Sequence, residues 1–146
     1  MSESIRRELR LPQPPEQVWL AIANRESLAD WMYPNNFEPT VGHAFNFHVP
    51  PNPKAGFEGI VVRCKVLVCE APKQLEFSWS ALNLEGTTVR FLLEPDGEGT
   101  RLSFEHAGFD LTQPGIDHAY QGANFGWGKM LEKLATVLAD SSTDHS

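Results

Sequence analysis

The order of the hydrophobic periodicities constrains this chain more than any other feature. A short alternating segment and a helical pair come first, a β-rich middle follows, and one long amphipathic segment closes the sequence. Alternation with period two predicts half-buried strands, and spacings of three and four predict a helix that buries one face. A sheet with a long helix laid across it is one way to build a pocket, although an ordinary core also buries helices on sheets.

The opening segment predicts one strand followed by two short helices. Within Ile5–Leu11 the apolar and charged residues alternate, except that Arg7 falls on the apolar parity. Pro15 suits the first turn of a helix, where a missing N–H costs no hydrogen bond. The first helix is marked by Val18, Trp19, Ile22 and Ala23, and the second by Leu28, Trp31 and Met32.

The middle of the chain predicts an antiparallel meander. Its expected strands are joined by short turns, which favours hairpin connections over crossovers. The segment Pro95–Gly99 predicts one such turn, and Pro50–Phe57 predicts a flexible loop beside the sheet. The strands are marked by Phe45, Phe47 and Val49, by Glu58–Cys69, by Leu75, Phe77 and Trp79, by Thr87–Leu93, and by Leu102, Phe104 and His106.

The closing segment predicts one long helix from about Gly115 to Asp140. Its apolar residues form a wide face, and Asn124 lies on the edge of that face. Glycines at 122, 126 and 128 weaken a helix by about 1 kcal/mol each relative to alanine. They favour a close approach of backbone to sheet or a bend near a pocket. The apolar positions are Tyr120, Ala123, Trp127, Met130, Leu131, Leu134, Val137 and Leu138.

Composition excludes several classes of function. A formal net charge of −7 disfavours nonspecific nucleic-acid binding, which requires lysine and arginine at the phosphates. No apolar stretch approaches the roughly 20 residues of a membrane span, and no signal peptide is visible, so we expect a cytoplasmic protein. Cys64 and Cys69 fall on opposite faces of one strand, which disfavours a disulfide between them. The histidines and cysteines show no metal-ligand spacing, so no metal and no cofactor are predicted.

Several segments together resemble a known superfamily. They are PPEQVWLAIANRESLADWM, VGHAFNF, EGIVVRCKVLVCEAPKQLEFSW, FLLEPDGEGTRLSFEHAGF and GWGKMLEKL. Their order and spacing resemble the START-like (SRPBCC) superfamily, and within it the family similar to the C-terminal domain of the activator of the heat shock protein 90 ATPase. The resemblance implies an α+β helix-grip fold of the Bet v 1 type. One domain is then expected over residues 1–140, with a flexible tail at 141–146.

The same resemblance directs attention to the space between sheet and helix. We predict a cavity there for a small hydrophobic or amphipathic ligand, lined mainly by aromatic rings that alternatively fill a solid core. His106 and Asn124 are expected to orient a polar group of the ligand. Trp31 either closes the pocket mouth or anchors the helical pair to the sheet. The predicted ligand-binding residues are Trp31, Phe45, Phe47, Phe77, Trp79, Phe91, Phe104, His106, Tyr120, Asn124, Trp127 and Leu131.

Other functions stay open at this point. A cyclase- or hydrolase-type enzyme would use the same cavity, with His106 as general acid or base and Tyr120 as the next candidate. A histidine that only serves the structure is the simpler alternative, because no nucleophile or carboxylate is identifiable beside it. A protein-interaction role with a chaperone partner is the third hypothesis, and an exposed strand edge would allow a homodimer.

Overall fold

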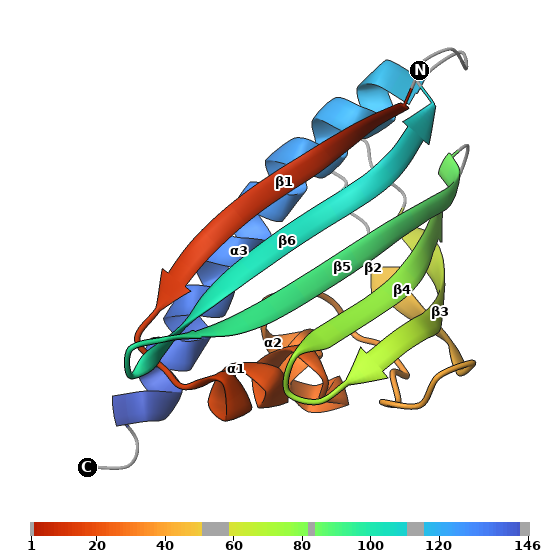
Figure 1. Ribbon diagram of the computed structural model, residues 1–146. Helices are drawn as coiled ribbons and strands as arrows, with labels where there is room; N and C mark the ends of the chain where they lie inside the picture. Colours follow the sequence, from red (N-terminus) through yellow and green to blue (C-terminus); the bar gives the residue numbers. More distant parts are fainter. Residues whose placement is uncertain (1, 51–58, 82–83, 111–115, 144–146) are drawn as a thin grey trace.

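The computed structural model describes residues 2–50, 59–81, 84–110 and 116–143. These residues form one six-stranded antiparallel sheet in the order β1-β6-β5-β4-β3-β2, with helix α3 (Ile116–Thr143) laid along its inner face (Figure 1). Two short helices cover one end of the same face. The predicted α+β helix-grip architecture is confirmed.

Five strands of the sheet form an antiparallel meander, and the first strand of the chain pairs with the last strand of that meander. From β2 (Ala44–Val49) through β3 (Ile60–Glu70), β4 (Gln74–Ala81) and β5 (Leu84–Asp96) to β6 (Gly99–Asp110), each strand pairs with the next. Strand β1 (Ser2–Leu11) then pairs with β6, so β1 and β2 form the two edges. Strands β5 and β6 extend beyond their predicted bounds, because backbone pairing continues past the last alternating apolar residue.

The β5–β6 hairpin has the tight turn that the sequence predicts. Asp96 pairs with Gly99, so two residues make the connection. Gly97 is the first of them and adopts φ +63°, a left-handed conformation that glycine reaches without steric cost. This placement of glycine matches a type II′ turn, whose twist suits the flanking strands.

Helices α1 (Pro15–Ile22) and α2 (Arg25–Trp31) form a pair whose ends are well defined. The side chain of Asn24 accepts hydrogen bonds from the backbone N–H groups of Glu26 and Ser27, which caps α2. The indole N–H of Trp31 donates to the carbonyl of Ala21 at 2.8 Å and fastens one helix to the other. Trp31 is buried, which supports its reading as an anchor.

Helix α3 buries one stripe of side chains against the sheet and the helical pair. Trp127, Leu131, Leu134 and Leu138 recur at the spacing of one helix face, and all four are buried. The helix extends past the expected end at Asp140 to Thr143. Residues 144–146 of the predicted tail and most of the predicted loop Pro50–Phe57 lie outside the described residues.

Arg7 breaks the apolar alternation of β1 for a structural reason. Its guanidinium donates to the backbone carbonyl of Arg6 at 2.9 Å and to the side-chain oxygen of Asn124 on α3. The Arg7 side chain therefore satisfies the backbone carbonyl of Arg6 in the edge strand β1 and connects that strand to α3. An apolar residue at this position would do neither.

Candidate functional site

The predicted aromatic residues do meet at the centre of the molecule. Rings from β2, β4, β5 and β6 contact one another in a continuous cluster, and Trp127 closes it from α3. The ring centroids of Phe104 and Trp127 lie 4.5 Å apart, and those of Trp79 and Trp127 lie 5.3 Å apart. We call this set the aromatic cluster; its members are Phe45, Phe47, Phe77, Trp79, Phe91, Phe104 and Trp127.

The rings of the aromatic cluster fill the space between them. Every member except Trp79 is at most 2% exposed. A ligand-sized void would leave accessible surface on its walls, and these walls have almost none. Side chains therefore fill the described interior, and Trp79, at 8% exposed, is the member with the most accessible surface.

A directional chain of hydrogen bonds is built into one end of the cluster. The indole N–H of Trp127 donates to Nδ1 of His106 at 2.9 Å, so Nδ1 carries no proton and Nε2 does. The Nε2–H then donates to the hydroxyl of Thr87 at 2.9 Å. The Thr87 hydroxyl in turn donates to the backbone carbonyl of Trp79 at 2.6 Å. We call this the histidine relay.

The histidine relay holds His106 in its neutral form. The side chain is fully buried, and desolvation by burial lowers the pKa of His106 to about 3. A second proton at Nδ1 would displace the indole N–H of Trp127. Sequence parity correctly places His106 on the inner face, while its partners come from β5 and α3.

The remaining predicted residues have different surroundings. Leu131 is buried, and the ring centroids of Trp31 and Phe91 lie 6.2 Å apart, edge to face. Asn124 accepts a hydrogen bond from Arg7 at the side of the molecule. Tyr120 belongs to α3, but its side chain lies outside the described residues.

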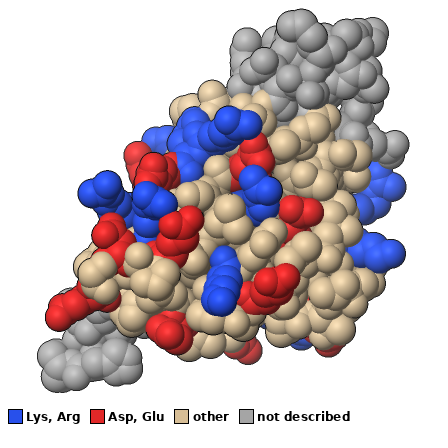
Figure 2. Space-filling model, viewed as in Figure 1, with Lys and Arg blue, Asp and Glu red and all other residues tan. Residues whose placement is uncertain are grey.

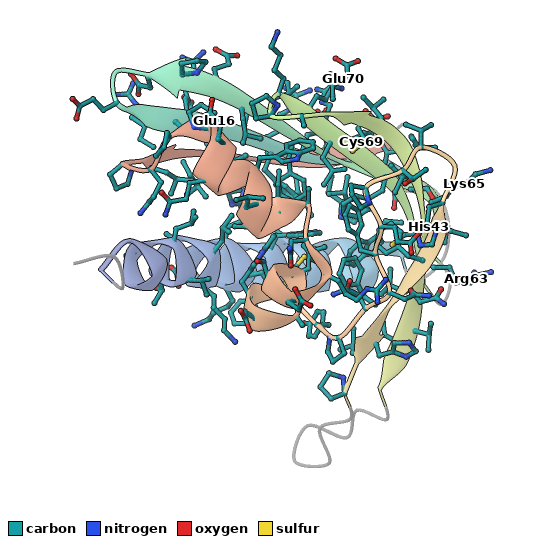
Figure 3. All side chains as sticks on the ribbon, turned by 90° about the horizontal axis from the view of Figure 1, so that it is seen from below. Glu16, His43, Arg63, Lys65, Cys69 and Glu70 are labelled. Atoms are coloured by element: carbon teal, nitrogen blue, oxygen red, sulfur yellow. The ribbon has the colours of Figure 1, made fainter. Side chains whose placement is uncertain are left out.

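The cysteines and the other histidines do not form a reactive centre within the part of the chain that the structure describes. Cys64 is buried, burial raises the pKa of its thiol, and both cysteines are free. Cys69 and His43 lie on the β2–β3 side of the molecule (Figure 3), where the Cys69 thiol donates to the carbonyl of Pro39. Among the described residues, no group of three or more His, Cys, Asp or Glu side chains is placed to hold a metal ion.

One surface hollow of about 450 Å³ lies on the outer face of the sheet, over β1, β5 and β6. Two of its cations share one carboxylate: Glu105 accepts from Arg6 at 2.8 Å and from Arg90 at 3.0 Å. Figure 2 shows this face, where basic and acidic side chains are interspersed. Arg6 and Arg90 are thus engaged with Glu105, which leaves them less available to a charged ligand.

A second hollow of about 400 Å³ lies between β1 and α3. Arg7 lines both hollows, which places it at the edge where the outer face of the sheet meets the helix.

None of the helices in the described ranges combines the length and apolar character that a membrane crossing requires.

The sequence analysis assigned no role to two polar side chains of these sites, Thr87 and Arg7. Thr87 lies on the inward parity of β5 with Val89 and Phe91, so a hydroxyl directed into an apolar face was the available signal. Arg7 was visible as an exception to the alternation. Its partner on α3, however, is 117 residues away in the sequence and no local pattern connects the two.

Comparison with known proteins gives a consistent result. Residues 12–139 match the family model described as "Activator of Hsp90 ATPase homolog 1-like protein". The crystal structure of protein MLL2253 from Mesorhizobium loti is 32% identical with a TM-score of 0.78, covering 95% of this chain and 98% of that one. The solution structure of BH1534 from Bacillus halodurans is 26% identical with a TM-score of 0.74, covering 93% and 96%.

A more distant structure shares only the fold. DynU16, described as a putative protein in the dynemicin biosynthetic locus, is 23% identical with a TM-score of 0.75. The match covers 93% of this chain and 47% of that one. Among curated proteins, none matches this chain significantly.

Proposed function

Because this chain belongs to the family of activator of Hsp90 ATPase homolog 1-like proteins and has a helix-grip fold, we propose that it binds a small hydrophobic or amphipathic molecule between sheet and α3. The observation that carries the proposal is the aromatic cluster with a polar chain at one end. Aromatic walls with a few fixed polar groups are the usual construction of small-molecule sites.

The closed centre determines where such a ligand would bind. Phe77 and Phe91 have no exposed surface, so a guest between them would have to force the strands and helix apart. Trp79 is the exception, and it lies near the end of β4 at Ala81. We therefore place the ligand against Trp79, with Trp127 and the other rings as the rigid wall behind it.

The histidine relay favours binding over catalysis. A general base needs a lone pair within reach of substrate, and the Nδ1 lone pair of His106 is occupied by the indole N–H of Trp127. A ligand against Trp79 would instead meet a wall held in a fixed orientation, because the relay runs from the indole of Trp127 to the backbone carbonyl of Trp79. The relay thus provides orientation without proton transfer.

The test is a ligand screen with a matched pair of tryptophan variants. Long-chain fatty acids and fused-ring phenols are titrated while thermal unfolding and tryptophan fluorescence are recorded. Ligands that raise the melting temperature of the wild-type protein should bind about tenfold more weakly to Trp79→Leu, since a large aromatic contact is lost.

Trp19→Leu is the control, because Trp19 is also 8% exposed but lies on α1. Its affinity for the same ligands should match that of the wild type. The proposal fails if no compound in either class raises the melting temperature, or if Trp79→Leu and Trp19→Leu bind equally well.

A further inference from the structure

The groove between the edge strand β1 and α3 has the features of a second binding site. It has a volume of about 400 Å³ and is lined by Arg7, Asn124, Phe125, Gly128, Lys129 and Glu132. We propose that this groove binds a small aromatic carboxylate, independently of any ligand at the aromatic cluster. Its volume lies in the lower part of the range for small-molecule sites, which suits a compound of one or two rings.

The positive charge of Arg7 is oriented but not neutralised. Its two hydrogen-bond acceptors, the carbonyl of Arg6 and the side-chain oxygen of Asn124, are both neutral. By contrast, Arg6, Arg90 and Arg101 each lie within ion-pair distance of a carboxylate. Among the described residues, Arg7 has no carboxylate within 4.0 Å. A guanidinium held in place by neutral groups is prepared for an incoming anion.

Lys129 adds a second cation to the groove. Its ammonium lies 5.6 Å from the centroid of the Phe125 ring, and no carboxylate of the described residues lies within 4.0 Å of it. Glu132 also lines the groove and opposes an anion. Two cations and one carboxylate leave an excess of one positive charge in a protein whose net charge is −7. The groove therefore favours a singly charged anion over a phosphate or other polyanion.

The apolar part of the ligand would contact Phe125. This ring is 71% exposed, the highest value among the exposed large apolar side chains of the described chain. A second aromatic ring stacked on it would remove apolar surface from water and gain a favourable ring contact. Gly128 leaves the floor of the groove open, since a Cβ built on it meets no atom within 4 Å.

Gly128 also makes the sharpest test available, because a side chain there blocks the groove without damaging the helix. Gly128→Leu places a branched side chain in open space and replaces glycine by a strong helix former. Gly126→Leu is the matched control. Gly126 belongs to the same helix and has the same free space around its Cβ, but it does not line the groove.

The experiment is an NMR titration of the ¹⁵N-labelled protein with naphthoate, and in parallel with its neutral analogue naphthalenemethanol. Naphthoate should shift the amide signals of Phe125, Gly128 and Lys129, and the neutral analogue should bind at least about fivefold more weakly, because it cannot receive the charge-assisted hydrogen bonds. Gly128→Leu should abolish these shifts while Gly126→Leu preserves them.

Charge removal provides the second arm. Arg7→Gln and Lys129→Gln should each weaken naphthoate binding about fivefold to tenfold, whereas Lys133→Gln, a lysine on the same helix outside the groove, should leave it unchanged. The proposal is overturned if naphthoate shifts none of the groove amides at millimolar concentration. It is equally overturned if Gly128→Leu still binds, or if the neutral analogue binds as tightly as naphthoate.

Discussion

Trp127 and Gly128 are neighbours in α3, yet they belong to opposite kinds of environment. Trp127 is almost completely buried, and its indole N–H begins a hydrogen-bond chain that ends on a backbone carbonyl. Gly128 lines an open groove where two cations have no carboxylate within ion-pair distance among the described residues. Two consecutive residues of one helix therefore belong to a region whose polar groups satisfy each other and to one whose charges are left for solvent or a ligand.

The difference indicates how each region responds to change. In the closed region every polar atom of the relay depends on its neighbour, so a single substitution leaves a buried group without a partner. In the groove, a substitution affects side chains that already contact water. We therefore expect a small change in the free energy of unfolding and a larger change in ligand affinity. Stability measurements and binding measurements should consequently separate the two regions.

The largest contrast is expected between two aromatic positions of α3 that are two residues apart. Trp127→Ala removes a ring that packs on Phe104 and Trp79, and should lower the free energy of unfolding by about 3–5 kcal/mol. Phe125→Ala should change it by no more than about 0.5 kcal/mol, because that ring is exposed. Urea unfolding monitored by circular dichroism measures both. Similar losses for the two variants would contradict the division of α3 into a closed and an open side.

A smaller effect should appear when pH is lowered. The folded protein holds the pKa of His106 near 3, below the usual value of 6.5, so the unfolded state takes up the proton first. The contribution of His106 to the free energy of unfolding is fully present above about pH 6.5. It falls by about 1.4 kcal/mol per pH unit as the pH drops toward 3, which amounts to about 2 kcal/mol between pH 7 and pH 5.

The measurement for this effect is the free energy of unfolding in urea at both pH values. His106→Gln should lose this part of the pH dependence, and His48→Gln should keep it, because His48 is exposed. An unchanged pH dependence in His106→Gln would show that the relay does not keep His106 neutral.

The smallest predicted effect concerns the helix itself. Gly126→Ala should raise the free energy of unfolding by about 1 kcal/mol, since the new methyl group meets no atom within 4 Å and alanine favours a helix. Gly108→Ala is the opposing control: Gly108 has φ +97°, and a Cβ there would lie 3.1 Å from the carbonyl oxygen of Gly86. Thermal unfolding should move upward for the first variant and downward for the second.

Much of the fold could be predicted because it depends on local periodicity. The alternation around Val62, Cys64 and Val66 predicted one buried face of β3, and those three side chains are buried. The β5–β6 turn followed from glycine at a position that needs a positive φ. Such features are determined by neighbouring residues, which a single sequence displays directly.

The candidate sites were predictable only in part, because they depend on contacts between distant segments. Parity placed His106 on the inner face but could not identify Thr87 or Trp127, which are 19 and 21 residues away. Asn124 was expected to orient a ligand, which stays a prediction; its hydrogen bond with Arg7 joins segments that no local pattern connects. The sequence did not predict the groove, because Arg7, its main cation, was interpreted only as an exception to the apolar alternation of a strand.

The position of β1 has a consequence for how the chain is made. Residues 2–11 are synthesised well before their partners, residues 100–110 of β6, the last strand of the sheet in sequence order. The ribosome must therefore deliver β6 before β1 can pair, and contacts of such long range slow the search for the native state. A growing chain stalled before β6 would carry an unpaired N-terminal strand, the substrate that chaperones and misassembly compete for.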